Sequence, residues 1–126
     1  MKTLFATIIL AGIFSCQYHN PAFKSVSVEA YERIIADSSV VRLDVRTAKE
    51  FAEGHIPNAV NIDVLPPNFI KKALATIPRN RTIAVNCRSG KRSKTAADLL
   101  AKKGYKVVEL DSGFKGWITD GNYIVK

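Results

Sequence analysis

The heptapeptide Cys87-Arg88-Ser89-Gly90-Lys91-Arg92-Ser93 holds the residue types of this chain that are best suited to chemistry. The cysteine directly follows an apolar run at residues 82–86, which predicts a buried parallel strand. An amphipathic helical pattern begins at the end of the heptapeptide. A short loop at the start of a helix points several backbone N–H groups at one place, and such a place holds anions.

Cys87 is predicted to be the anion in this loop. A free thiol has a pKa of ~8.5, and both N–H dipoles and nearby cations favour the thiolate. A buried structural cysteine is the alternative interpretation, but Arg88, Lys91 and Arg92 beside it disfavour that role. The sequence therefore predicts a reactive cysteine with a lowered pKa.

The N-terminal segment predicts export. Lys2 precedes an apolar run at residues 4–14, which is too short for a permanent membrane span and is typical of a signal peptide. Ile13-Phe14-Ser15-Cys16 resembles the lipobox of bacterial lipoproteins, whose cysteine is acylated and becomes the first residue. We expect a signal peptide over residues 1–15 and a lipid on Cys16, which places the domain at the periplasmic face of a membrane. A plain cleaved signal and an uncleaved anchor are the alternatives.

Cys16 and Cys87 are the two cysteines of the chain. If Cys16 is acylated, no structural disulfide is available, and the folded part must rely on its core. Cys87 then remains a free thiol in an oxidising compartment, where such a group is normally reactive.

Length and charge narrow the class of protein. The 126 residues suffice for one domain. The net charge is +8 and the pI about 9.7, but the basic residues are scattered and form neither a zinc-finger spacing nor a basic helix. We therefore expect no nucleic-acid partner, and instead small anionic substrates or anionic lipid headgroups.

Beyond a polar tether at residues 16–24, strands and helices alternate through one domain at residues 25–126. Helices are predicted at 28–35, 50–53, 66–77, 91–103 and 114–120, and extended segments at 40–45, 59–62, 82–86, 107–110 and 123–125. This alternation predicts an α/β fold, an open parallel sheet of about five strands with helices on both faces. Ligands bind such sheets at the carboxyl ends of strands, where Cys87 falls.

Three separated segments carry a family resemblance. They are Leu43-Asp44-Val45-Arg46-x3-Glu50-Phe51-x2-Gly54-His55-Ile56-Pro57-x-Ala59-x-Asn61-Ile62, the Cys87 heptapeptide, and Gly104-Tyr105-x-Val107-x2-Leu110-x2-Gly113-Phe114-x2-Trp117. In this order they resemble the signatures of rhodanese homology domains. The resemblance covers residues 25–125.

The resemblance implies a sulfurtransferase. Cys87 would take a sulfane sulfur from thiosulfate or a similar donor, and pass it from a persulfide to a thiol or cyanide-like acceptor. The residues that would bind the substrate are Arg88, Ser89, Gly90, Lys91, Arg92 and Ser93. Their backbone N–H groups would surround the outer sulfur, the cations would attract the donor and stabilise departing sulfite, and a serine would donate a hydrogen bond. Neither a metal nor an organic cofactor is expected.

Several other polar residues are assigned supporting roles. Asp44 and Arg46 are predicted to tie loops together, and Glu50 to pair with Arg92. His55 is interpreted as structural, because a thiolate that the loop already ionises needs no base. Phe114 and Trp117 are predicted to be core or pocket wall.

Two other functions stay open at this point. The domain could be a membrane-tethered persulfide carrier or binding module for a partner protein. It could also be a phosphatase or arsenate reductase of the same fold, but those enzymes have a loop one residue longer than the four residues between Cys87 and Arg92.

Overall fold

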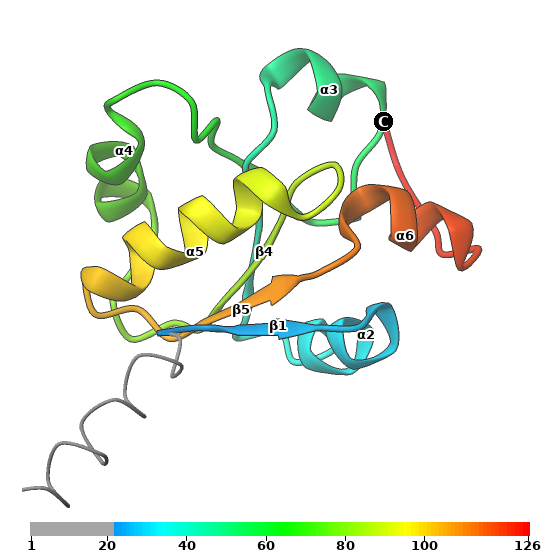
Figure 1. Ribbon diagram of the computed structural model, residues 1–126, viewed down its shortest axis with the longest axis horizontal. Helices are drawn as coiled ribbons and strands as arrows, with labels where there is room; N and C mark the ends of the chain where they lie inside the picture. The colour runs from blue at the N-terminus through cyan, green and yellow to red at the C-terminus, as the bar shows by residue number, and fades with distance from the viewer. Residues whose placement is uncertain (1–21) are drawn as a thin grey trace, which may run out of the picture.

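A computed structural model describes residues 22–126, which fold around a five-stranded sheet (Figure 1). All strands are parallel, in the order β1-β5-β4-β2-β3. The strands are β1 (Lys24–Val26), β2 (Val41–Asp44), β3 (Val60–Asn61), β4 (Ile83–Asn86) and β5 (Val107–Leu110). This confirms the predicted open parallel sheet, with β4, the strand before Cys87, at its centre.

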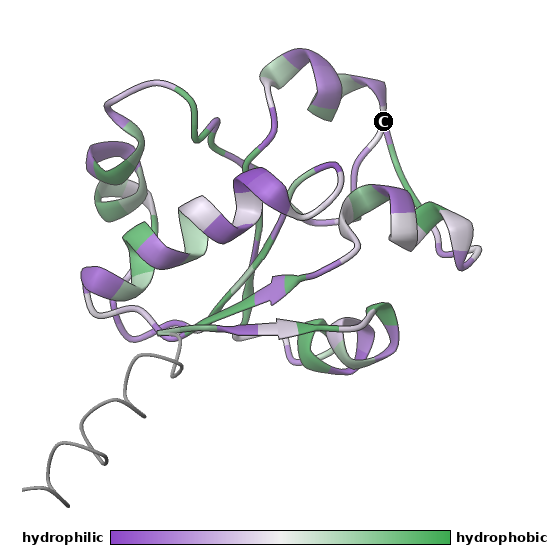
Figure 2. Ribbon diagram, viewed as in Figure 1, coloured by the Kyte–Doolittle hydropathy of each residue, from purple (hydrophilic) through white to green (hydrophobic). Residues whose placement is uncertain are grey.

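Helices cover both faces of the sheet. They are α2 (Val28–Ile35), α3 (Ala48–Glu53), α4 (Phe69–Thr76), α5 (Lys91–Lys102) and α6 (Gly113–Thr119). The α4 and α5 helices pack on one face, and α2 and α6 on the other (Figure 1). Hydrophobic and hydrophilic residues alternate along α5, as its position between sheet and solvent requires (Figure 2).

Each face has its own apolar core. The first contains buried residues of β2, β4 and β5 together with Phe69, Ala73, Ala96, Ala97 and Leu100 from α4 and α5. The second contains Val28, Tyr31 and Ile35 of α2, and Phe114 and Trp117 of α6. Phe114 and Trp117, predicted to be core or pocket wall, are thus core residues.

Helix ends follow local sequence signals. The Ser27 side chain accepts a hydrogen bond from the Ala30 N–H and begins α2 as predicted. Thr47 and Glu50 form a capping box that begins α3, and this box also fixes the backbone that carries the Glu50 side chain.

The N-terminal strand β1 was not predicted. It crosses the expected boundary at residue 25, because Lys24 pairs with Val108 and Ser25 with Glu109. At the other end, the extended segment at 123–125 forms a single antiparallel bridge, between Val125 and His55. The predicted signal peptide and Cys16 lie outside the described residues. Within residues 22–126, no helix has the length and apolarity needed to cross a membrane.

Candidate active site

The loop from β4 to α5 folds tightly over the start of the helix. Gly90 has φ 97°, a left-handed conformation that favours glycine. A Cβ at Gly90 would also overlap the backbone carbonyl oxygen of Asp111. The loop can therefore close in this way only with glycine at this position.

Cys87 lies within this loop and is 1% exposed. The Gly90 N–H donates a hydrogen bond to Cys87 Sγ at 3.1 Å, and Ser93 Oγ lies 3.3 Å from the sulfur. Burial raises the pKa of the thiol, but the hydrogen-bonding contact with the Ser93 hydroxyl and the hydrogen bonds from the N–H groups of Ser93, Gly90 and Ser89 outweigh it. The net pKa lies below the ordinary value, as the sequence predicted, and Ser93 is the serine whose hydroxyl contacts the sulfur.

The first turn of α6 holds the loop from outside. The Phe114 N–H donates to the Cys87 carbonyl at 2.8 Å, and the Lys115 N–H donates to the Arg88 carbonyl at 3.0 Å. A Cβ on Gly113 would overlap the backbone of Arg88, so α6 approaches the loop more closely than a larger residue allows. The position of the loop thus depends on α6 as well as on β4.

Arg92 is fixed by an ion pair rather than free in the loop. Its two terminal nitrogens donate to Glu50 Oε1 at 2.7 Å and Oε2 at 2.9 Å, which confirms the predicted pair. The hydrogen bonds from Arg92 lower the pKa of Glu50 to about 2, so the pair is ionised at neutral pH. This two-point contact holds the planar guanidinium in one orientation beside the loop.

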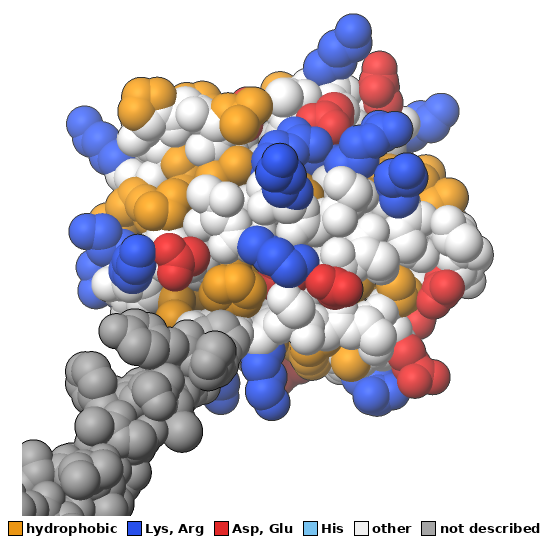
Figure 3. Space-filling model, in the orientation of Figure 1, with side chains coloured by type: hydrophobic (Ala, Val, Ile, Leu, Met, Phe, Trp, Pro, Cys, Tyr) orange, Lys and Arg blue, Asp and Glu red, His pale blue; other side chains and the backbone are white. Residues whose placement is uncertain are grey.

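The other cations around the loop are exposed. Arg88, Lys91 and Lys115 face solvent and make no ion pair among residues 22–126. Figure 3 shows Lys and Arg side chains gathered on the surface where α3, α6 and the start of α5 meet. A dianion approaching Cys87 therefore meets positive charge first.

A buried ion pair supports the loop from the side of α3. Arg46 is 3% exposed, contacts both carboxylate oxygens of Asp44 at 2.8–3.1 Å, and donates to the Gly54 carbonyl at 2.7 Å. Its guanidinium also lies 4.2 Å from the ring centroid of Phe114. The prediction that Asp44 and Arg46 tie loops together is confirmed.

His55 has a structural environment. Its ring stacks on Phe51 with centroids 3.6 Å apart, and Nδ1 lies 2.8 Å from the Phe51 carbonyl oxygen. Its backbone exchanges two hydrogen bonds with Val125. These contacts agree with the interpretation of His55 as structural.

Sequence reasoning missed three polar residues near the sulfur: Glu109, Ser25 and Lys94. Glu109 on β5 is fully buried and accepts hydrogen bonds from Ser93 and Ser25, and Lys94 lies beside it. The alternation of side chains along β5 carried a signal for Glu109, because residues two apart in a strand share one face and Val107 is apolar. A carboxylate on the core face of a central strand indicates a polar site within the core.

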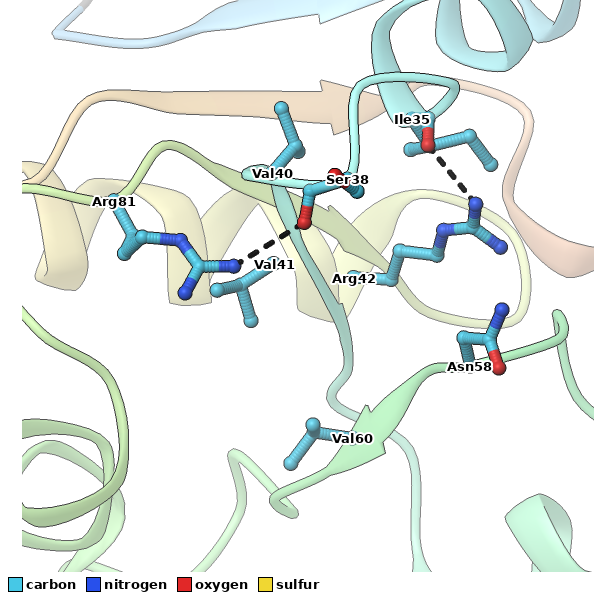
Figure 4. A pocket seen from close by; sticks show the side chains of 8 residues that line it. All are labelled: Ile35, Ser38, Val40, Val41, Arg42, Asn58, Val60 and Arg81. Carbon is cyan, nitrogen blue, oxygen red and sulfur yellow. Dashed lines mark hydrogen bonds between the residues drawn. The ribbon is translucent and has the colours of Figure 1, made fainter.

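A pocket of about 340 Å³ lies at the other end of the strands (Figure 4). Arg42 donates there to the Pro57 carbonyl at 2.6 Å and the Ile35 carbonyl at 2.9 Å, and Arg81 donates to the Ser38 carbonyl at 3.4 Å. Both guanidiniums thus connect segments of backbone.

Within residues 22–126, no cluster of three or more His, Cys, Asp or Glu could hold a metal ion. The Cys87 loop is the candidate active site.

Comparison with known proteins gives the family. The model of the rhodanese-like domain matches residues 27–120. A sulfurtransferase of Allochromatium vinosum is 35% identical over 102 residues, covering 79% of this chain and 92% of that protein. Thiosulfate sulfurtransferase 16, chloroplastic, of Arabidopsis thaliana is 31% identical over 111 residues, covering 80% and 90%. The crystal structure of a rhodanese-related protein from Thermoplasma volcanium superposes with a TM-score of 0.70 at 29% identity, covering 82% of this chain and 98% of that one. Because the family model spans β2 to β5 and the Cys87 loop between them, this chain belongs to the rhodanese-like domain family.

Proposed function

We propose that the protein is a sulfurtransferase that carries sulfur on Cys87. The observation behind this proposal is the geometry around the buried Cys87 sulfur, which accepts a hydrogen bond from the Gly90 N–H at 3.1 Å and lies 3.3 Å from Ser93 Oγ. These contacts lower the pKa of the thiol. A thiolate is the reactive form of cysteine, and oriented N–H groups also stabilise the anionic outer sulfur of a persulfide.

Thiosulfate or a similar small anion is the proposed donor. The Cys87 sulfur attacks the outer sulfur of thiosulfate, the S–S bond of the donor breaks, and sulfite leaves with the electron pair. Exposed Arg88 and Lys91 raise the local concentration of the dianion and stabilise departing sulfite. Matched relatives named as thiosulfate sulfurtransferases support this donor class. A thiol or cyanide-like acceptor, or a partner protein, then removes the sulfur.

Mass spectrometry of the intact full-length protein tests this function. After incubation with thiosulfate, the wild-type protein should gain the mass of one sulfur atom, and cyanide should remove it. The Cys87→Ser variant should gain nothing. An unchanged wild-type mass, or the same gain in Cys87→Ser, would contradict the proposal.

We also propose that the domain is exported and lipid-anchored through Cys16. Support comes from the apolar run at residues 4–14 followed by Ser15 and Cys16. In a bacterial host, Cys16→Ala should leave an unprocessed precursor or release the domain from the membrane fraction. Correct cleavage of Cys16→Ala with full membrane retention would show that another feature anchors the protein.

A further inference from the structure

A hydrogen-bonded chain leads from the reactive sulfur into the sheet. The Cys87 thiol donates to Ser93 Oγ at 3.3 Å, and the Ser93 hydroxyl donates to Glu109 Oε2 at 2.5 Å. These residues belong to the loop, α5 and β5, and the Glu109 side chain is 0% exposed. The chain thus connects the sulfur to a carboxylate that has no contact with solvent.

Glu109 has two further polar neighbours, Ser25 and Lys94. Ser25 donates to Oε1 at 2.6 Å. Lys94 Nζ lies 3.3 Å from Oε1 and 3.4 Å from Oε2, but it is closer to Asp111, at 2.8 Å, and is 42% exposed. Lys94 is therefore shared between two carboxylates, and its charge only partly balances Glu109.

One titratable group lies across the sheet. Tyr31 on α2 is fully buried, and desolvation, followed by the charge of Asp44, raises its pKa far above its ordinary value. It therefore stays neutral. The described groups that can exchange a proton with Glu109 directly are thus Ser93, Ser25 and Lys94, and of these Ser93 alone also contacts Cys87.

The Ser93 hydroxyl has a single hydrogen and cannot donate to both neighbours at once. Its separation of 2.5 Å from Oε2 is typical of an O–H group that donates to a carboxylate. The lone pairs of Ser93 Oγ are then free to accept the thiol hydrogen. Once Cys87 is bonded to a second sulfur, it has no hydrogen to donate, so its contact with Ser93 survives only if the hydroxyl turns toward it.

We propose that Glu109 holds the proton of Cys87 while sulfur is bound, an inference that rests on the proposed sulfurtransferase function. As the Cys87 electron pair attacks the outer sulfur of thiosulfate, the thiol proton moves to Ser93 Oγ and the hydroxyl proton moves to Glu109 Oε2. Sulfite leaves with the electron pair of the broken S–S bond. The proton returns to Cys87 after an acceptor has removed the outer sulfur.

This exchange keeps the charge behind the loop constant. A persulfide anion and an ionised Glu109 would place two negative charges in a buried site, where like charges strongly disfavour joint ionisation. With the proton on Glu109, both hydrogen bonds reverse direction. The carboxyl group then donates to Ser93 Oγ, and the Ser93 hydroxyl donates to the sulfur. Glu109 is a positioning residue in this scheme, because it acts on the sulfur through Ser93.

Infrared difference spectroscopy on the full-length protein tests this proposal directly. The spectrum of thiosulfate-loaded protein minus reduced protein should show a new band in the C=O stretching region of protonated carboxyl groups. The band should be absent from loaded Glu109→Gln. It should persist in Asp98→Asn, a control that removes an exposed carboxylate paired with Lys102 at the far end of α5.

Mass spectrometry on the same samples separates the two proposals. If wild-type protein gains no sulfur, the proposed function fails, and this inference with it. If wild-type protein gains sulfur but shows no carboxyl band, or if loaded Glu109→Gln retains the band, Glu109 does not hold the proton and the function stands. The Ser93→Ala variant keeps the carboxylate but lacks the hydroxyl, so a full band in loaded Ser93→Ala would overturn the route through Ser93.

Discussion

Replacing Gly90 by alanine tests whether the loop backbone sets the reactivity of Cys87. Gly104, at the end of α5, provides a matched control, because its φ of 96° is nearly the same as the 97° of Gly90. An alanine in the left-handed region costs about 1–2 kcal/mol at either position. A Cβ at Gly90 would overlap Asp111, whereas a Cβ at Gly104 has no described atom within 4 Å. The two variants therefore share the backbone strain and differ in the displacement of the loop.

The effect on Cys87 follows from the bond that the displacement breaks. The Gly90 N–H lies 3.1 Å from the sulfur, and a hydrogen bond to a charged group contributes about 1.5–3 kcal/mol. Its loss raises the pKa of Cys87, and at a fixed pH below the wild-type midpoint the thiolate fraction falls by about one to two orders of magnitude. The loop must also move to relieve the overlap with Asp111, and this movement lowers the free energy of unfolding of Gly90→Ala by about a further 1–3 kcal/mol.

Alkylation by iodoacetamide, a small neutral reagent, measures the thiolate as a function of pH. Gly90→Ala should react slowly at neutral pH and show its midpoint at higher pH, while Gly104→Ala should match wild-type protein. Urea unfolding gives the stability of each variant and shows that it is folded. If folded Gly90→Ala shows the wild-type midpoint, or if Gly104→Ala shifts it equally, the loop N–H groups do not control the thiol.

Three further perturbations address the surroundings of the loop. Arg46→Met leaves Asp44 buried without its cation, which should cost about 3–5 kcal/mol in urea unfolding; a loss below about 1 kcal/mol would contradict the role of this pair. Arg88→Ala and Lys91→Ala should each raise KM for thiosulfate with little change in kcat. Added salt should reduce the difference in KM from wild-type protein. An unchanged KM in both variants at low ionic strength would indicate an uncharged or protein-bound donor. Because the folded-state pKa of Glu50 is lowered to about 2, its ion pair stabilises the fold above the unfolded-state carboxyl pKa, and this contribution disappears as pH falls through about 2. The unfolding free energies of wild type and Glu50→Gln should therefore differ at neutral pH and converge in acid; a difference that does not change with pH would contradict this role.

The sequence predicted the loop well because its signals are local. An apolar run, a glycine and the start of an amphipathic helix are neighbours along the chain, and together they define a strand–loop–helix unit. The α2 cap at Ser27 is equally local. Even the pair between Glu50 and Arg92, 42 residues apart, was predictable once the fold placed both residues at the carboxyl edge of the sheet.

Other features depend on contacts that no local pattern reports. The β1 strand has three residues, two of them exposed, and it exists because β5 offers an unpaired edge. The alternation along β5 places Glu109 on the same face as Val107, but carboxylates are almost never fully buried without partners. Its partners come from β1 and α5, at Ser25 and Ser93, so the contacts that permit its burial became visible only with the tertiary structure.

The directions of the loop peptides explain how the site is preorganised for an anion. The carbonyls of Cys87 and Arg88 accept hydrogen bonds from α6, and the Gly90 carbonyl accepts one from Lys94. With these oxygens held away from the sulfur, the N–H groups of the loop can point toward it. Oriented dipoles of this kind stabilise an anion without reorganising during the reaction. We infer that α6 and Lys94 contribute to reactivity without contacting the sulfur, because they fix the direction of the groups that do.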